Sequence, residues 1–319
     1  MYLKRIFAII GLTVMLFAST PIAVAQQTSG SGLSISPTRS ELTINPGKAD
    51  IIQITLKNIS GVDIKAVAVV NNFDSNNETG EPKIITDPSV QSPNSIKNFL
   101  IGVGDIIIKK DETKKISIPV QIPSDTVSGA YYGIIRYTAE PVSKEEATQK
   151  QVALNASLGL IVLIQVPGNI TEQVQAQKIS AERDGRSTSF FIAPPSQISI
   201  ALKNTGNGFT KPFGHVSVSK GGKEVFAYEM NNTDPRSNIL PNKSRVFKDN
   251  IKNVNKLGRY TVTANISYGQ GGDILTLKTS FWVLPMWFIM TVVIIMFGLF
   301  GLGYLIYRRI SGKRDQRRF

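Results

Sequence analysis

The sequence contains no cysteine and a single histidine, His215. The absence of cysteine excludes disulfide bonds, thiol catalysis, thiolate metal sites and the modified cysteine of a lipoprotein. One histidine cannot build a histidine zinc site, and without a second histidine or a cysteine the usual hydrolase triads are also excluded. We therefore expect a structural role for His215, and a protein that is not an enzyme and holds no cofactor.

Other catalytic signatures are missing as well. The chain has no GxSxG elbow, no GxxxxGK[ST] loop and no HExxH helix. The adjacent carboxylates Glu145 and Glu146 belong to a polar stretch, 143–151, that we expect to be a solvated loop rather than a glycosidase site.

Basic charge is concentrated at the two ends of the chain. The formal net charge is +13, from 36 Lys and Arg residues and 23 Asp and Glu residues. The middle of the chain is only mildly positive and has no basic stripe interleaved with aromatic residues, so we exclude a nucleic-acid partner. The basic residues of the ends are Lys4, Arg5, Arg308, Arg309, Lys313, Arg314, Arg317 and Arg318.

Both ends also carry an apolar run. Residues 1–25 combine Lys4 and Arg5, a short apolar stretch and a final Ala-Val-Ala, which is the pattern of a cleaved signal peptide, although an uncleaved anchor is the alternative. Residues 286–307 contain no charged residue and have aromatic residues near both edges, as a transmembrane helix does. The basic tail at 308–319 should stay in the cytoplasm, which places the N-terminal domains outside the cell.

The chain between these ends shows a period of two residues rather than 3.6. Ile52, Ile54 and Leu56 alternate with polar residues, and similar alternation recurs at 116–122, 152–166, 198–202 and 262–268. Alternation of this kind predicts β-strands with one buried face. We expect an all-β protein of the immunoglobulin-like sandwich class, with turns at intervals that suit a sandwich better than a propeller.

A repeat divides this region into two domains. Leu56-Lys57-Asn58 recurs as Leu202-Lys203-Asn204, and each tripeptide ends an alternating run and enters a glycine-containing turn. We predict two tandem immunoglobulin-like β-sandwiches, at 30–166 and 176–284, joined by a linker at 167–175. A single large jelly roll is the alternative.

The opening segment 34–42, Ser-Ile-Ser-Pro-Thr-Arg-Ser-Glu-Leu, followed by Pro46-Gly47 and the Leu56-Lys57-Asn58 strand, resembles the start of exported immunoglobulin-like domains of the major-sperm-protein and pilus-chaperone superfamily. The layout of the whole chain is similar to the WxL-interacting proteins of Gram-positive bacteria, which carry DUF916-type and DUF3324-type domains. That resemblance implies binding of peptidoglycan and surface partners. The pilus-chaperone resemblance implies that Arg39 holds a carboxylate.

Two further groups of residues are candidate sites. Tyr131, Tyr132, Arg136 and Tyr137 could form a sugar-binding platform, since aromatic faces stack on sugar rings, although a core strand is the alternative. Asp74, Asn76 and Glu78 have the alternate spacing of a calcium loop, but Thr79 replaces the expected glycine, and a polar hairpin loop is the alternative.

These observations favour a non-catalytic binding or scaffold protein at the plasma membrane of a bacterial cell. Its expected partners are a cell-wall polymer or a surface protein, together with the membrane that holds its single C-terminal span. A membrane-tethered assembly factor or chaperone that works by β-strand complementation is the alternative.

Overall fold

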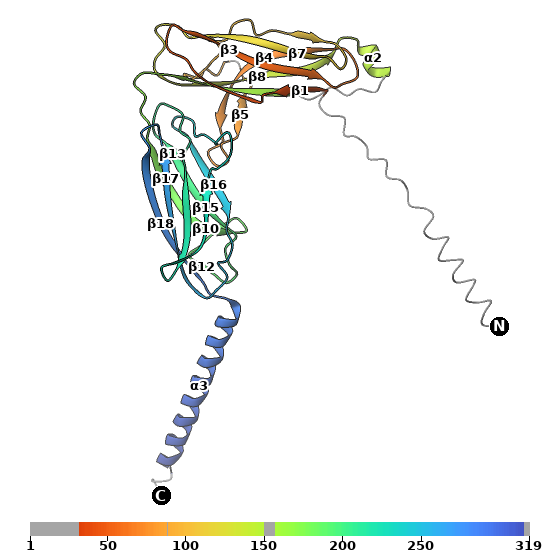
Figure 1. Ribbon diagram of the computed structural model, residues 1–319. Helices are drawn as coiled ribbons and strands as arrows, with labels where there is room; N and C mark the ends of the chain where they lie inside the picture. The colour runs from red at the N-terminus through yellow and green to blue at the C-terminus, as the bar shows by residue number, and fades with distance from the viewer. Residues whose placement is uncertain (1–31, 88, 150–156, 316–319) are drawn as a thin grey trace, which may run out of the picture.

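The computed structural model describes residues 32–87, 89–149 and 157–315. Two β-sandwiches follow one another and meet at an angle, and a long helix leaves the far end of the second one (Figure 1). The predicted signal peptide at 1–25 lies outside the described residues. The fold class is therefore as predicted: tandem immunoglobulin-like sandwiches and one C-terminal apolar helix.

The first sandwich encloses a core of alternate strand residues such as Leu56, Ile118 and Val162, all buried. Its smaller sheet has the order β1 (Leu33–Ser36), β3 (Ala49–Asn58), β7 (Thr113–Gln121). Its larger sheet has the order β2 (Arg39–Thr43), β9 (Ser157–Val166), β8 (Gly129–Pro141), β4 (Ile64–Ser75), β5 (Pro82–Ile85), and β6 (Ile106–Ile108) also pairs with β4.

The second sandwich has the same plan around a separate core that includes Ile200, Val262 and Phe281. One sheet has the order β11 (Arg186–Ser187), β10 (Val174–Arg183), β13 (Gln197–Asn204), β16 (Ser244–Asn250). The other has the order β12 (Phe190–Phe191), β18 (Asp273–Val283), β17 (Gly258–Tyr268), β14 (Phe213–Lys220), β15 (Lys223–Met230). The chain therefore forms two sandwiches with separate cores and not the single jelly roll that was the alternative.

The repeated asparagine has the same hydrogen-bonding role in both sandwiches. Asn58 and Asn204 are fully buried at the ends of β3 and β13. Asn58 Nδ2 donates to the carbonyls of Val62 at 2.7 Å and Ile108 at 3.1 Å. Asn204 Nδ2 donates to those of Gly208 at 2.8 Å and Ile239 at 3.0 Å. A buried amide that satisfies several loop carbonyls fixes the turn that follows the strand, which is the physical reason for the repeat.

The alternating runs form the predicted strands, except that 152–156, the start of the run at 152–166, lies outside the described residues. Residues 52–56 lie in β3, 116–121 in β7 and 262–268 in β17, and Tyr268 and Asp273 close the hairpin into β18. The expectation of a loop throughout 143–151 was wrong, because Lys144–Gln149 forms a short helix, α2. Its sequence, KEEATQ, consists mostly of good helix formers, so a polar segment forms a helix here rather than a loop.

The C-terminal helix α3 runs from Met286 to Asp315. Within Met286–Arg308, a window of 18 residues has a mean hydropathy of 2.4, and this window is not buried by the rest of the described chain. Twenty-three helical residues span about 34 Å, which matches the roughly 30 Å hydrocarbon core of a bilayer. The helix is therefore long and apolar enough to cross a membrane, and only Leu284 and Pro285 separate it from β18.

Candidate functional site: the cleft between the two sandwiches

An apolar cluster joins the two sandwiches. The outer face of the first sandwich's larger sheet contributes Phe73, Tyr132 and Leu163, and the second sandwich contributes Leu240 and the partly buried Phe209. The Tyr132 ring lies 5.1 Å from the ring of Phe73 and 6.3 Å from that of Phe209. We call this cluster, with Ile134, Ile84 and Ile161, the interdomain seam. Burial of this area holds the sandwiches together.

The β4–β5 hairpin reaches across to the second sandwich. Its Glu78 carbonyl accepts a hydrogen bond from Val246 N at 2.9 Å, so the hairpin tip covers the outer edge of β16. The Asp74 carboxylate pairs with Lys243 at 2.6 Å, and the Glu78 carboxylate pairs with Lys248 at 3.0 Å. An otherwise open strand edge is thus covered, which is how native sheets avoid unwanted pairing.

The candidate calcium residues lie in this hairpin. Asp74 and Glu78 face lysines of the second sandwich, whereas Asn76 Oδ1 accepts the backbone N–H of Glu78 at 2.8 Å within the loop. Among the described residues there is no group of three or more acidic or histidine side chains that could hold a metal ion. In this geometry the polar residues connect the two sandwiches.

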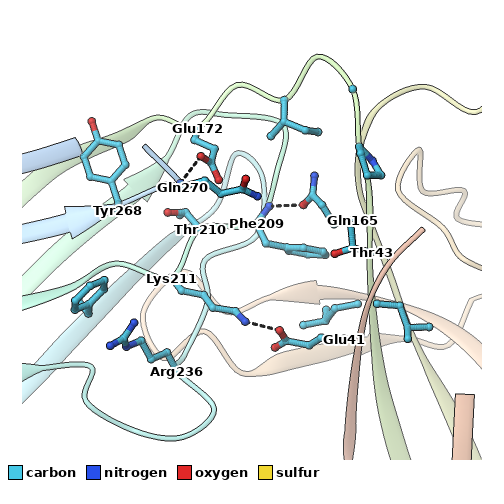
Figure 2. Close-up of a pocket in the computed structure, with 17 residues that line it drawn as sticks. Glu41, Thr43, Gln165, Glu172, Phe209, Thr210, Lys211, Arg236, Tyr268 and Gln270 are labelled. Atoms are coloured by element: carbon cyan, nitrogen blue, oxygen red, sulfur yellow. Dashed lines mark hydrogen bonds and ion pairs between the residues drawn. The ribbon is translucent and has the colours of Figure 1, made fainter. Parts of the chain in front are cut away.

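A cavity of about 730 Å³ opens on one side of the seam (Figure 2). Glu41 and Gln165 line it from the first sandwich, and Lys211 and Arg236 line it from the second. Gln165 Oε1 accepts the N–H of Phe209 at 3.2 Å, while Gln165 Nε2 is buried without a hydrogen-bond partner. The cavity therefore offers both charges and a free amide donor.

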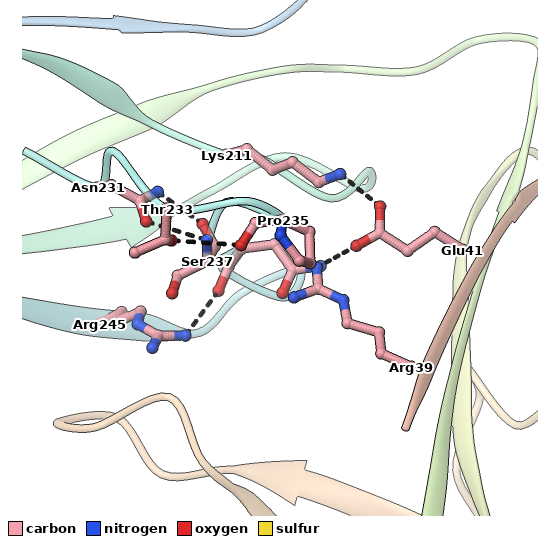
Figure 3. Close-up of polar contacts among 9 residues, drawn as sticks. Arg39, Glu41, Lys211, Asn231, Thr233, Pro235, Ser237 and Arg245 are labelled. Atoms are coloured by element: carbon pink, nitrogen blue, oxygen red, sulfur yellow. Dashed lines mark hydrogen bonds and ion pairs between the residues drawn. The ribbon is translucent and has the colours of Figure 1, made fainter. Parts of the chain in front are cut away.

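A chain of charges crosses the cleft beside this cavity. The Glu41 carboxylate lies between two cations, Arg39 on its own strand β2 and Lys211 on the second sandwich, and pairs with both (Figure 3). Neighbouring residues on a strand point to opposite faces, so Arg39 and Glu41, two positions apart, share the face that meets the second sandwich. The Glu41 carboxylate is therefore shared by two cations.

A second, smaller cavity of about 210 Å³ lies next to this chain of charges. Arg39 and Leu163 line it from the first sandwich, Arg245 and Ser237 line it from the second, and Leu163 also lines the larger cavity. Arg245 Nη1 donates to the carbonyl of Asn238 at 3.3 Å. The guanidinium of Arg245 also occupies the space beside Gly80, where an added Cβ would lie 2.5 Å from Arg245 Nη1. Glycine at position 80 therefore lets the hairpin approach the arginine.

Two arginines and one carboxylate, Glu81, line this smaller cavity, so its walls carry a net positive charge. Burial lowers the pKa of Arg245, the nearby charge of Arg39 lowers it further, and the charge of Glu81 raises it. Arg39 Nε is buried and has no hydrogen-bond partner among the described residues. A guanidinium presents its donors in a planar fork that matches a carboxylate or a phosphate. The cavity therefore has the chemistry to bind an anion.

The aromatic residues predicted as a sugar platform do not lie together. Tyr137 is buried in the first core, Tyr132 lies in the interdomain seam, and Tyr131 packs against Phe99 and donates its hydroxyl to the carbonyl of Val127 at 2.9 Å. Arg136 is half-buried, and its Nε donates to Asn71 Oδ1 at 3.0 Å. Of the predicted site residues, only Arg39 lines the cleft cavities.

His215 lies outside the cleft cavities, on the exposed side of β14. Its Nδ1 lies 2.8 Å from Glu229 Oε1 on the neighbouring strand β15. Cross-strand pairs of this kind support a sheet. No nucleophile or second base accompanies the pair in the described contacts.

Sequence reasoning did not find the basic residues of the second sandwich. Lys211, Arg236 and Arg245 come from two loops and a strand that follow no motif. Arg236 lies over the ring of Phe213, with 3.7 Å between its guanidinium carbon and the ring centroid, so its position is fixed by a cation–π contact. These residues converge on Arg39 only because the two sandwiches are docked.

Comparisons with known proteins find solved structures that are similar to this chain at low identity. No family model and no curated protein matches the chain. Among solved structures, the class 5 fimbriae chaperone CfaA matches with 14% identity and a TM-score of 0.39 over 78% of this chain and 98% of its own. A structure of the Salmonella enterica SafA pilin with the SafB chaperone matches with 10% identity and a TM-score of 0.34 over 79% and 96%.

A third similar structure is a PapD-like domain of human CEP192, with 14% identity and a TM-score of 0.30 over 47% of this chain and 95% of its own. Identities of 14% and below, with TM-scores under 0.4, assign no function to this chain.

Proposed function

We propose that the protein is a non-catalytic binding protein, anchored in the plasma membrane by α3, that holds an anionic group of an exported partner in the interdomain cleft. The observation that supports this proposal is the pair Arg39 and Arg245 on opposite walls of a 210 Å³ cavity, with the buried Nε of Arg39 unpartnered. An unsatisfied buried donor costs free energy, and a ligand that supplies the acceptor recovers it.

We propose a protein carboxylate as the anion, as at the C-terminus of a chain. The cavity is small, and apolar residues such as Phe73 and Leu240 line it beside the two guanidinium groups and the Glu81 carboxylate. A planar carboxylate with an apolar neighbour suits such walls better than the hydrated phosphates of a wall polymer. Wall polymer remains the competing ligand of the same site.

The first experiment measures peptide binding to the full-length protein in detergent micelles. Pentapeptides with free C-terminal carboxylates are compared with the same peptides as amides, and inorganic phosphate is the third probe. We expect carboxylate peptides to bind and amides not to bind. Arg39→Gln should weaken binding by about ten- to a hundredfold, the loss of one charge-assisted hydrogen bond. Equal binding of acid and amide would overturn the carboxylate assignment.

The matched control is Arg186→Gln, which removes the same charge from an exposed arginine on β11, at the opposite end of the second sandwich. Its affinity for carboxylate peptides should equal that of the wild type. Enrichment of purified wall material at low salt, lost in Arg39→Gln and competed by phosphate, would favour the polymer over a protein partner.

One further observation favours the alternative of β-strand complementation. The outer edge of β18 is paired only at Trp282 and Val283, and no described strand covers it between Asp273 and Phe281. Trp282 N donates outward to Ser189 O at 2.8 Å, so the other even-numbered residues of β18 also direct their N–H groups outward. An exported segment could add a strand there.

Lys278→Pro tests this alternative, because proline removes an outward N–H without removing a bond to β17. Lys278→Ala is the control for loss of the side chain. Partner capture that is lost with proline and kept with alanine would support strand addition, whereas equal capture by both variants would exclude it at this edge.

A further inference from the structure

The end of the second sandwich from which α3 leaves is markedly basic. The turns at this end, together with the adjoining strand ends, carry seven Lys and Arg residues against three acidic ones, of which Glu182 is buried and Asp184 pairs with Arg183 at 3.5 Å. The basic residues are Arg183, Arg186, Lys220, Lys223, Lys252, Lys256 and Arg259.

Strand register places these residues at one end. Arg259 is opposite Trp282, next to the last residue of β18, and Lys220 is opposite Tyr260. Lys220 Nζ also donates to the carbonyl of Leu257 at 2.6 Å, which ties the β14–β15 turn to the loop before β17. In Figure 1, β12 and the start of α3 lie at this same end.

Four of the seven basic side chains are exposed and make neither an ion pair nor a side-chain hydrogen bond among the described residues: Arg186, Lys223, Lys252 and Lys256. Arg259 is also exposed, but it donates to Ser280 Oγ at 3.0 Å. The basic residues at the opposite end differ, since Lys211 and Lys243 each face a carboxylate of the first sandwich. Unpaired like charges that converge on one end create a local positive potential.

Exposed apolar side chains accompany this charge. Phe190, Ile192 and Trp282 are 63%, 54% and 41% exposed, although each belongs to a residue type that is usually buried. Phe190 is the register partner of Trp282, and Leu284 N donates to the carbonyl of Phe191 at 2.7 Å. The segment that carries the apolar residues is therefore bonded to the chain just before α3.

Distance places this end at a membrane surface. Leu284 is two residues from Met286, where α3 begins, and two residues span about 7 Å at most. The headgroup layer on each side of the hydrocarbon core is of similar depth, roughly 5–8 Å. If α3 spans the bilayer from Met286, then Trp282, four residues earlier, and its neighbour Phe190 lie within about 14 Å of the hydrocarbon core, at the outer edge of the headgroup layer, where aromatic side chains are favoured.

We propose that this basic and aromatic end of the second sandwich docks on the anionic lipid headgroups of the membrane that α3 crosses. The proposal rests on the membrane anchoring proposed above. Anchoring confines the sandwich to the bilayer surface, so each weak contact acts at high effective concentration. Each basic residue close to an anionic leaflet adds a favourable electrostatic contribution. Docking of this kind would fix the direction in which the cleft faces the cell exterior.

The chain offers a direct probe, because its two tryptophans are Trp282 at the docking end and Trp287 in α3. The full-length protein is reconstituted into vesicles of phosphatidylcholine alone or phosphatidylcholine with phosphatidylglycerol. In Trp287→Phe, only Trp282 emits. We expect its emission to be blue-shifted and quenched by lipids brominated near the headgroup when phosphatidylglycerol is present, and much less so without it or at high salt.

Two outcomes separate this proposal from the anchoring itself. In Trp282→Phe, only Trp287 emits, and it reports the insertion of α3. If brominated lipid does not quench Trp287, the anchoring proposal fails. Suppose that brominated lipid quenches Trp287 in all vesicles, but that acrylamide quenches Trp282 of the Trp287→Phe variant as strongly in vesicles as in detergent. In that case anchoring stands and docking is overturned.

Charge neutralisation tests the electrostatic part. Changing the four unpaired basic residues to Gln should abolish the phosphatidylglycerol-dependent quenching of Trp282 while Trp287 stays quenched. An equal charge change on exposed lysines of the first sandwich, at Lys97, Lys109, Lys110 and Lys115, is the matched control and should change neither. Loss of quenching in both variants would show a net-charge effect and would overturn specific docking. Quenching of Trp282 that needs an added wall extract rather than anionic lipid would assign this end to another partner.

Discussion

The two sandwiches share a plan and differ in the sheet face that points away from their own core. In the first, that face is apolar, with Tyr132, Ile134 and Leu163 all buried by the second sandwich. In the second, the matching face carries polar residues such as Asn265 and Thr276, whose side chains bond to one another at 2.9 Å in solvent. The first sandwich therefore needs the second to cover it, whereas the second has a complete surface of its own.

A rigid arrangement follows from this asymmetry. The seam and the hairpin contacts fix the first sandwich on the second. Only two residues connect β18 to α3, so the second sandwich has little freedom to move relative to the helix. The cleft cations gather only in that docked state. The binding proposed for the cleft therefore depends on the stability of the seam.

The largest expected effect comes from the feature that the sandwiches share. Asn58→Ala and Asn204→Ala each leave several buried loop carbonyls unpaired, and each should lower the free energy of unfolding by about 2–4 kcal/mol. Denaturant unfolding of the full-length protein in detergent measures both. The exposed Asn232→Ala is the control and should have little effect. A large effect in one sandwich alone would show that the two corners are not equivalent.

The second prediction concerns the outer sheet face, which is apolar in the first sandwich and polar in the second. Leu240→Ala removes a buried side chain from the seam and should cost about 2–3 kcal/mol, at the lower end for leucine truncations because the seam borders a cavity. Ile274→Ala truncates a residue on the outer face of the second sandwich that is 69% exposed, and should cost much less. Equal costs would mean that the seam contributes no more to stability than an exposed surface does.

The hairpin contacts should contribute less. Hydrogen bonding to Glu78 raises the pKa of Lys248, so the contribution of the pair is fully present below the ordinary lysine pKa and is lost as pH rises through the raised value. Because the side chains are largely solvent-exposed, a double-mutant cycle of Lys248→Gln and Glu78→Gln should give a coupling of less than about 1 kcal/mol that falls with added salt.

Lys65 and Asp105 form an exposed ion pair within the first sandwich, at 2.8 Å, and serve as the control. If only the Lys248–Glu78 cycle changes carboxylate-peptide affinity at the cleft, the hairpin helps to hold the docked state. If neither cycle does, the seam holds it alone.

Much of this architecture is visible in the sequence, because period-two burial and the repeated asparagine are local signals. The docking of the two sandwiches could be predicted in part from the sequence. Residues 160–164, Leu-Ile-Val-Leu-Ile, are apolar at odd and even positions alike, and such a strand is typically buried on both faces. Alternation accounted for the even-numbered Leu160 and Val162, which lie in the first core. The odd-numbered Ile161 and Leu163 lie in the seam with the second sandwich.

The cleft could not be predicted in the same way. Arg39 and Arg245 lie far apart in sequence, and nothing local marks either as a partner of the other. The aromatic residues on β8 are close together in sequence but do not share one face. Strand alternation directs Tyr131 and Tyr137 to the first core and Tyr132 to the seam.

The smallest expected effect concerns a position at which the two cores differ. Ile118 on β7 pairs with Ile52, and the repeat places Asp249 on β16, opposite Ile198, at the equivalent position. Burial raises the pKa of Asp249, so its charged form opposes folding above that pKa, and the penalty is relieved as pH falls toward the ordinary aspartate value. Asp249→Asn should therefore stabilise the protein at neutral pH. The gain should be under about 1 kcal/mol because Asp249 is only half-buried.

This gain should shrink as pH falls through the raised pKa and disappear below the ordinary one, which unfolding curves over a pH series can measure. The exposed Asp273→Asn, at the β17–β18 hairpin, is the matched control. A gain at Asp249 that does not vary with pH would mean that shape or hydrogen bonding, rather than charge, separates the second core from the first. In that case Asp249→Ile, which restores the residue found in the first core, should stabilise the protein more than Asp249→Asn does.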